Sequence, residues 1–152
     1  MFDNQLHGSD LLQLLVRRAP PVAATRPNAA SYPLRMILLG SEQLAKTVCT
    51  AIRTGDLDGL RTVLAEQPDL ATAYIKSADA ERSLLHVATD WPGHFPNNVE
   101  VVTTLIAAGA DVNARLRGPH TETPLHCAAS SEDVDVLYAL LDAGADIEAM
   151  AP

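Results

Sequence analysis

The sequence predicts an all-α protein, built as a solenoid of about three helix pairs with short finger loops between them. The first observation is internal repetition, because residues 83–114 recur as residues 123–149. The second is the spacing of aliphatic residues at three and four positions within each copy, which is typical of helices with one buried face. The third is the composition: hydrophobic residues make up 47% and aromatic residues only 4%, so small aliphatic side chains must pack the helices together.

Residues 1–40 are predicted to form a flexible, basic arm rich in proline and alanine. The arm carries a charge of +2, and the net charge of −8 therefore leaves −10 on residues 41–152. Prolines interrupt the arm, and no helical period is sustained in it. Asp10 can cap a short helix through Arg18 that places three leucines on one face, Leu11, Leu14 and Leu15. This segment matches an LxxLL pattern that docks in hydrophobic grooves, and a frayed helix at the domain edge is the alternative.

Two segments carry the same ordered motifs. The first reads Ser83-Leu-Leu-His86-Val-Ala88 and then Gly109-Ala-Asp-Val-Asn-Ala114; the second reads Thr123-Pro-Leu-His126-Cys-Ala128 and then Gly144-Ala-Asp-Ile-Glu-Ala149. These motifs resemble the TPLH-x-A and GAD-V-N-A signatures of the ankyrin repeat family. The resemblance covers residues 42–149 and implies an ankyrin repeat domain at 41–152, with β-finger loops and repeats at about 42–78, 79–118 and 119–152. The first repeat lacks both motifs, so we expect it to act as an N-terminal cap.

The resemblance implies helices near residues 44–53, 57–66, 84–90, 99–107, 124–130 and 134–142, and capping residues and apolar spacing support them. Ser83 and Thr123 each offer a hydroxyl N-cap, and Pro124 fits a first helical turn, where a missing N–H costs nothing. Gly109 and Gly144 stand just past the second helix of a pair, where a left-handed residue ends a helix at low cost. We expect no sheet of more than two short strands.

The resemblance also implies that His86 and His126 are structural, with an imidazole that ties backbone groups of adjacent repeats. The family period of about 33 residues shows where this chain departs from the pattern. The two signature glycines are 35 residues apart, and the two signature histidines are 40 apart. The chain therefore carries two extra residues in the finger at 115–122 and five more in the loop at 90–98.

An ankyrin resemblance implies a protein-protein interaction module, which binds an unidentified partner through the concave surface of its fingers and first helices. The finger at 115–122 puts two arginines on an acidic domain, and arginine is enriched in interface cores. The loop at 90–98 holds the only tryptophan. We therefore predict partner contacts by seven residues: Trp91, His94, Phe95, Arg115, Arg117, His120 and Glu122. The alternatives are a solvated finger and a loop that folds its aromatic side chains onto the helices.

No catalytic residue, cofactor or metal site is predicted. His94 and His120 lie at opposite ends of a helix, too far apart to share a zinc ion. Cys127 directly follows His126, so the two side chains do not face each other. The acidic charge disfavours a nucleic-acid partner, and the longest apolar run near the start, residues 11–16, is too short to span a membrane. Two cysteines without metal-ligand spacing suit a reducing compartment, so we expect a cytoplasmic protein.

Three further interpretations stay open. The compact length favours a small bacterial protein. A truncated repeat fragment would self-associate through an uncapped C-terminal face, because without a fourth repeat four side chains would lose about half of their burial: Val136, Leu137, Leu140 and Leu141. A metal-dependent or thiol-dependent enzyme would use His86, His126 and Cys127.

Overall fold

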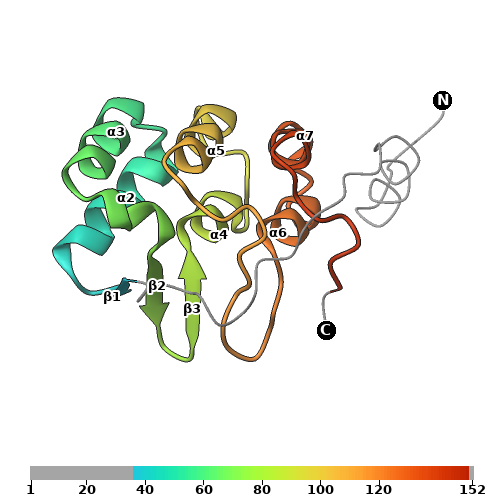
Figure 1. Ribbon diagram of the computed structural model, residues 1–152, viewed down its shortest axis with the longest axis horizontal. Coiled ribbons are helices and arrows are strands. Elements are labelled where there is room, and N and C mark those ends of the chain that lie inside the picture. The colour runs from blue at the N-terminus through green and yellow to red at the C-terminus, as the bar shows by residue number, and fades with distance from the viewer. Residues whose placement is uncertain (1–35, 151–152) are drawn as a thin grey trace.

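The structure of the chain, a computed structural model, describes residues 36–150. Six α-helices in this part form two layers (Figure 1). The inner layer holds α2 (Gln43–Thr54), α4 (Leu84–Thr89) and α6 (Pro124–Ser130), and the outer layer holds α3 (Leu57–Glu66), α5 (Asn98–Ala107) and α7 (Val134–Asp142). A 3-10 helix, η1 (Pro68–Thr72), follows α3. The six predicted helices are confirmed, with ends that differ by no more than one residue. The predicted helix with Leu11, Leu14 and Leu15 lies outside the described residues.

The predicted caps set the limits of the helices. Ser83 Oγ accepts a hydrogen bond from the backbone N–H of His86 (3.4 Å). Thr123 and His126 form a capping box, in which the Thr123 N–H donates to Nδ1 of His126 (3.2 Å). Gly109 and Gly144 have φ angles of 104° and 92°, in the left-handed region that glycine adopts without strain. The chain therefore leaves α5 and α7 at the positions that the sequence indicates.

A three-stranded sheet lies beside the first inner helices. Its strands β1 (Ile37–Leu39), β2 (Tyr74–Ser77) and β3 (Ala80–Ser83) pair in the order β1-β2-β3, with β1 parallel to β2 and β2 antiparallel to β3. The expectation of no more than two short strands is wrong, because Ile37–Leu39 adds to the edge of the β2–β3 hairpin. The folded part also begins before the predicted boundary at residue 41. Strand β1 lies at the end of residues 1–40, and the high proline content of that segment as a whole gave no indication of a short apolar strand.

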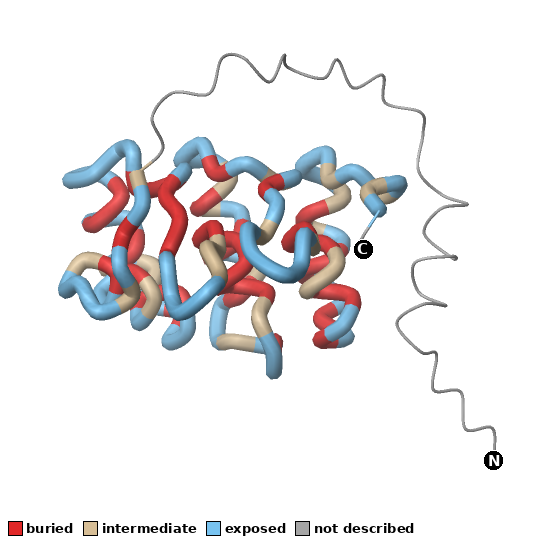
Figure 2. The backbone as a smooth tube through the Cα atoms, turned by 90° about the horizontal axis from the view of Figure 1, so that it is seen from below, coloured by how far each residue is buried: buried red, intermediate tan, exposed pale blue. Residues whose placement is uncertain are grey.

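Side chains from facing helices form one core, because α4 packs against α2 and α6, and α5 packs against α3 and α7. Figure 2 shows the buried residues along the middle of the stack and the exposed ones at its loops. The expectation that the α7 residues lose half of their burial is wrong. Val136, Leu137 and Leu140 are at most 2% exposed because α7 directs them toward α5 and α6, and Leu141 is half-buried. The exposed apolar residues of α7 are Val134 and Tyr138.

Candidate partner-binding groove

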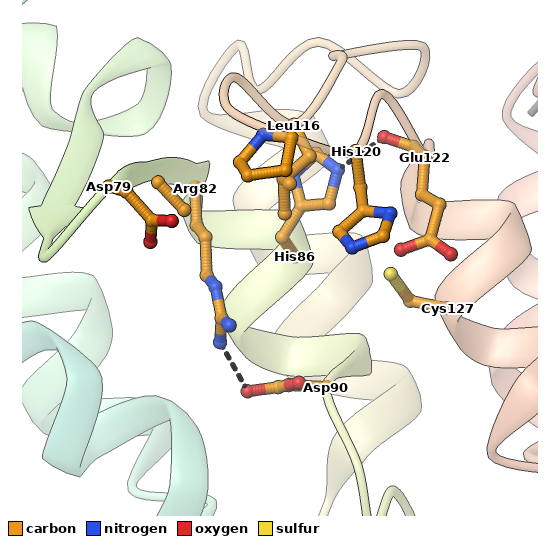
Figure 3. A pocket seen from close by; sticks show the side chains of 10 residues that line it. Asp79, Arg82, His86, Asp90, Leu116, His120, Glu122 and Cys127 are labelled. Atoms are coloured by element: carbon orange, nitrogen blue, oxygen red, sulfur yellow. Dashed lines mark hydrogen bonds and ion pairs between the residues drawn. The ribbon is translucent and has the colours of Figure 1, made fainter. Parts of the chain in front are cut away.

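A pocket of about 300 Å³ lies on the inner-helix side, between the β2–β3 hairpin and the finger at 115–122 (Figure 3). We call it the finger pocket. Residues from two consecutive repeats line it: Asp79, Ala80, Arg82, His86, Asp90, Leu116, Pro119, His120, Glu122 and Cys127. Two predicted partner-binding residues, His120 and Glu122, are therefore brought together here.

Hydrogen bonds hold the finger in place on both sides of the pocket. The backbone N–H of Leu116 donates to the carbonyl oxygen of Glu122 (2.9 Å), which closes the finger on itself. Nε2 of His86 lies 3.0 Å from the same carbonyl oxygen, a contact that joins this histidine to the finger leading into the next repeat. His126 contacts Thr123 of its own repeat instead. The finger is thus a fixed wall of the pocket.

The two finger arginines have partners within the chain. The Arg117 guanidinium lies over the Tyr74 ring, 4.2 Å from its centroid, and its Nη1 atom is 3.3 Å from a carboxylate oxygen of Glu81. Nη1 of Arg115 donates to the carbonyl oxygens of Thr121 (3.1 Å) and Met150 (2.7 Å). Neither arginine lines the pocket. Both join the finger to neighbouring segments.

Carboxylates dominate the charge of the finger pocket. Asp90 pairs with Arg82 at 2.7 Å and with Arg53 at 3.8 Å. The side-chain carboxylate of Glu122 makes no hydrogen bond or ion pair within residues 36–150, and Figure 3 shows it beside the His120 imidazole and the Cys127 thiol. The pocket therefore offers an unpaired negative charge.

The buried histidine and thiol lack the arrangement of a nucleophilic site. Burial, reinforced by the charges of Glu122 and Asp90, raises the pKa of Cys127 to about 11, so the thiol stays protonated at neutral pH. Burial also lowers the pKa of His86, and its two ring nitrogens already contact Ser83 Oγ and the Glu122 carbonyl. In the part of the chain that the structure describes, no three His, Cys, Asp or Glu side chains are grouped to hold a metal ion.

The inserted loop lies apart from the pocket lining, although Asp90, which lines the pocket, begins it. Its backbone is anchored, because the His94 N–H donates to Asp133 (2.9 Å) and the Asn97 side-chain amide donates to the Gly55 carbonyl (3.0 Å). Trp91 is nevertheless 80% exposed, His94 is exposed and Phe95 is half-buried. The seven predicted contact residues thus fall in two places, the finger and the loop.

Sequence reasoning missed several residues that form the pocket. Leu116 and Pro119 supply apolar walls from the finger, and Arg82 and Asp79 come from the preceding hairpin. Leu116 was detectable as an apolar residue inside a polar finger. The hairpin residues were not, since β-finger loops were expected between the repeats but the residues that form the strands of this one were not predicted.

Paired inner and outer helices, with fingers that project beside the inner layer, define a helix-pair repeat protein. A family model described as ankyrin repeats, in three copies, matches residues 51–151. The chain belongs to the ankyrin repeat family.

One curated relative is the RelA-associated inhibitor of mouse (Mus musculus), which is 35% identical over 97 residues. The match covers 64% of this chain and 10% of that protein, so the chain spans a small part of the length of this relative. A mouse relative gives no support to the expected bacterial source. Among residues 36–150, no helix combines the length and apolar character needed to cross a bilayer.

Proposed function

We propose that this chain is a non-catalytic protein-binding module that holds its partner against the inner helices and fingers, centred on the finger pocket. The observation that carries the proposal is the pocket itself, which opens between two consecutive repeats and has a hydrogen-bonded finger as one wall. Concave sites with apolar walls and a few polar groups are typical of binding sites. The fold by itself implies no particular partner.

The similarity to a protein named as RelA-associated supports a protein partner for this chain. The absence of catalysis is supported by the raised pKa of Cys127 and by the use of both His86 ring nitrogens in structural contacts. No cofactor enters the proposal. We also propose a reducing, cytoplasmic location, which the two free cysteines support.

The contact residues that we propose are His120 and Glu122 in the pocket, with the loop residues Trp91, His94 and Phe95 as a second contact region. We assign Arg115 and Arg117 to the placement of the finger, because their guanidinium groups have partners within the chain.

A photo-reactive residue tests the proposed face. We would introduce benzoylphenylalanine at His120 of the full chain and, as the control, at Thr103, which is exposed on the outer helix α5. Capture of one protein from position 120 and not from position 103 is expected. The captured protein, once purified, should bind His120→Trp at least about tenfold more weakly than the wild type, while Thr103→Trp is unaffected. Equal capture from both positions, or equal affinity of both tryptophan variants, would contradict the proposal.

Self-association through the C-terminal face is a second candidate. Two exposed apolar side chains on α7, Val134 (36%) and Tyr138 (45%), favour it. The original reason, loss of burial at Val136, Leu137 and Leu140, does not hold in the structure.

A further inference from the structure

We infer that the finger pocket receives an arginine or lysine side chain, so that the partner presents a basic segment to the inner-helix face. The inference rests on the proposed function, because it names the chemistry of the partner at that same site. Its evidence is the charge of the lining, the form of the walls and the distribution of charge over the folded part.

The lining has an excess of carboxylates over cations. Three carboxylates line the pocket, Asp79, Asp90 and Glu122, and the single arginine or lysine among the lining residues is Arg82. Arg82 is already paired with Asp90 at 2.7 Å. Asp79 and Glu122 have no ion pair with any residue between 36 and 150. Two negative charges are therefore free to meet a cation.

Glu122 is the carboxylate that we place against the incoming charge. It is half-buried, and Figure 3 shows its carboxylate at the pocket wall that Cys127 and His120 also form. A charge partly withdrawn from water attracts an opposite charge more strongly than an exposed one does. The thiol of Cys127 responds to the same field, since the charges of Glu122 and Asp90 add to burial in raising its pKa.

The walls suit the stem of a long cationic side chain. Leu116 and Pro119 of the finger and Ala80 of β3 present apolar atoms to the pocket. Arginine and lysine side chains lay their methylene groups along such surfaces while the charged head reaches a polar group. A volume of about 300 Å³ leaves room for one such side chain.

The charge of the whole folded part favours the same partner. Residues 41–152 carry −10, and four arginines near this face have carboxylate or carbonyl partners within the chain: Arg53, Arg82, Arg115 and Arg117. An excess of one sign attracts a partner of the opposite sign and speeds its association. A basic segment is thus favoured on approach as well as at the pocket.

The test is a titration of the full ¹⁵N-labelled chain, followed by NMR, with three probes: N-acetylarginine amide, N-acetyllysine amide and N-acetylglutamate amide. We expect saturable shifts of the backbone amides at 79–82, 116–118, 120–122 and 127 with the two cationic probes and none with the acidic probe. Glu122→Gln should weaken binding of the arginine probe at least about fivefold. Glu100→Gln is the matched control, because Glu100 is exposed on α5 and outside the pocket and its loss changes the net charge equally.

Asp79→Asn provides a second variant, because Asp79 is exposed in the β2–β3 turn and its replacement should leave the fold intact. Asp79→Asn should also weaken binding of the arginine probe, though less than Glu122→Gln does. Equal shifts with the cationic and acidic probes, or equal effects of Glu122→Gln and Glu100→Gln, would overturn the inference. Either result leaves the proposed function standing if photo-crosslinking from position 120 captures a partner, so the two failures are distinguishable.

Discussion

The guanidinium of Arg117 lies 4.2 Å from the centroid of the Tyr74 ring, across the boundary between two repeats. The same arginine pairs with Glu81, and the backbones of Glu81 and Arg117 exchange hydrogen bonds of 2.7 and 3.0 Å. The finger of one repeat is therefore attached to the hairpin of the preceding repeat by stacking, charge and backbone together.

Replacing Arg117 should therefore lower stability. If both arginines were partner contacts, as the sequence suggests, Arg115→Ala and Arg117→Ala would each leave the free energy of unfolding within about 0.5 kcal/mol of the wild type. From the structure we expect Arg117→Ala to reduce the free energy of unfolding by about 1 kcal/mol, because it removes a half-exposed cation–π contact and an ion pair. Urea denaturation provides the measurement. Arg61→Ala is the control, since the Arg61–Asp58 pair is exposed and its loss should leave the midpoint unchanged. Equal midpoints of urea denaturation for the two variants would contradict a structural role for Arg117 and favour its prediction as a partner contact.

Acidification should destabilise the chain through His86. Burial lowers the pKa of His86 in the folded state, while in the unfolded state it stays near its ordinary value of about 6.5. As the pH falls through that value, the unfolded state takes up a proton first, so the free energy of unfolding decreases. The contribution is fully present above that pH and is lost below it.

Urea denaturation at about pH 7.5 and about pH 5.5 measures this effect of His86. His86→Gln should reduce the difference in stability between the two pH values, whatever its effect on stability at one pH. Thr103→Gln is the control, because Thr103 is exposed and neither residue titrates, so this replacement should leave the difference as in the wild type. Unchanged pH dependence in His86→Gln would show that this imidazole is not responsible.

The Cys127 thiol should react slowly. Its pKa of about 11 leaves a very small thiolate fraction at neutral pH, and the thiolate is the reactive form. In a Cys49→Ser background, we expect reaction with Ellman's reagent at least about tenfold slower in the folded chain than in guanidinium. If Cys127 reacted faster in the folded chain than in guanidinium, the result would support the alternative of a thiol-dependent enzyme.

Alanine replacements of Trp91 and Phe95 should have different effects on partner binding and on the stability of the fold. Trp91 is 80% exposed, so Trp91→Ala should change the free energy of unfolding by less than about 0.5 kcal/mol while it weakens partner binding. Phe95 is half-buried, and Phe95→Ala should cost roughly 1–2 kcal/mol of stability. Because the chain has one tryptophan, acrylamide quenching of its fluorescence reports on the loop directly. Weak quenching in the free chain would favour a loop folded onto the helices.

Self-association, if it uses α7, should depend on Tyr138. Sedimentation velocity over about a hundredfold range of concentration should show association that Tyr138→Lys reduces, since a charge replaces an exposed apolar contact. Added salt should strengthen the association, because Asp135 and Asp142 on the same helix are exposed and screening reduces their repulsion. A strict monomer over the whole range would remove this candidate.

Local signals explain what the sequence predicted well. The limits of α6 and α7 depend on Thr123, Pro124 and Gly144. Each of these residues affects only backbone groups within about one helical turn of its own position, so its effect can be recognised in the local sequence. Strand β1 depends on pairing between Ile37 and Tyr74. Because these residues are far apart in the chain, no local sequence pattern predicts the strand.

The candidate site also contains both kinds of feature, those that local sequence indicates and those that depend on contacts between distant residues. The count of residues in the finger singled out a segment whose His120 and Glu122 line the finger pocket. The partners of Arg115, by contrast, include the carbonyl of Met150, 35 residues away, which only the folded chain brings near.

The carboxylate of Asp133 links the inserted loop to the third repeat. It is 5% exposed and accepts hydrogen bonds from the His94 N–H, the Asn98 side-chain amide and the Val136 N–H. Deleting the insertion would leave a buried charge with fewer donors, and replacing Asp133 first would remove one of the two anchors of the loop. The two changes are therefore epistatic: each is more harmful alone than after the other, so the order in which mutations arise decides whether this loop can be lost.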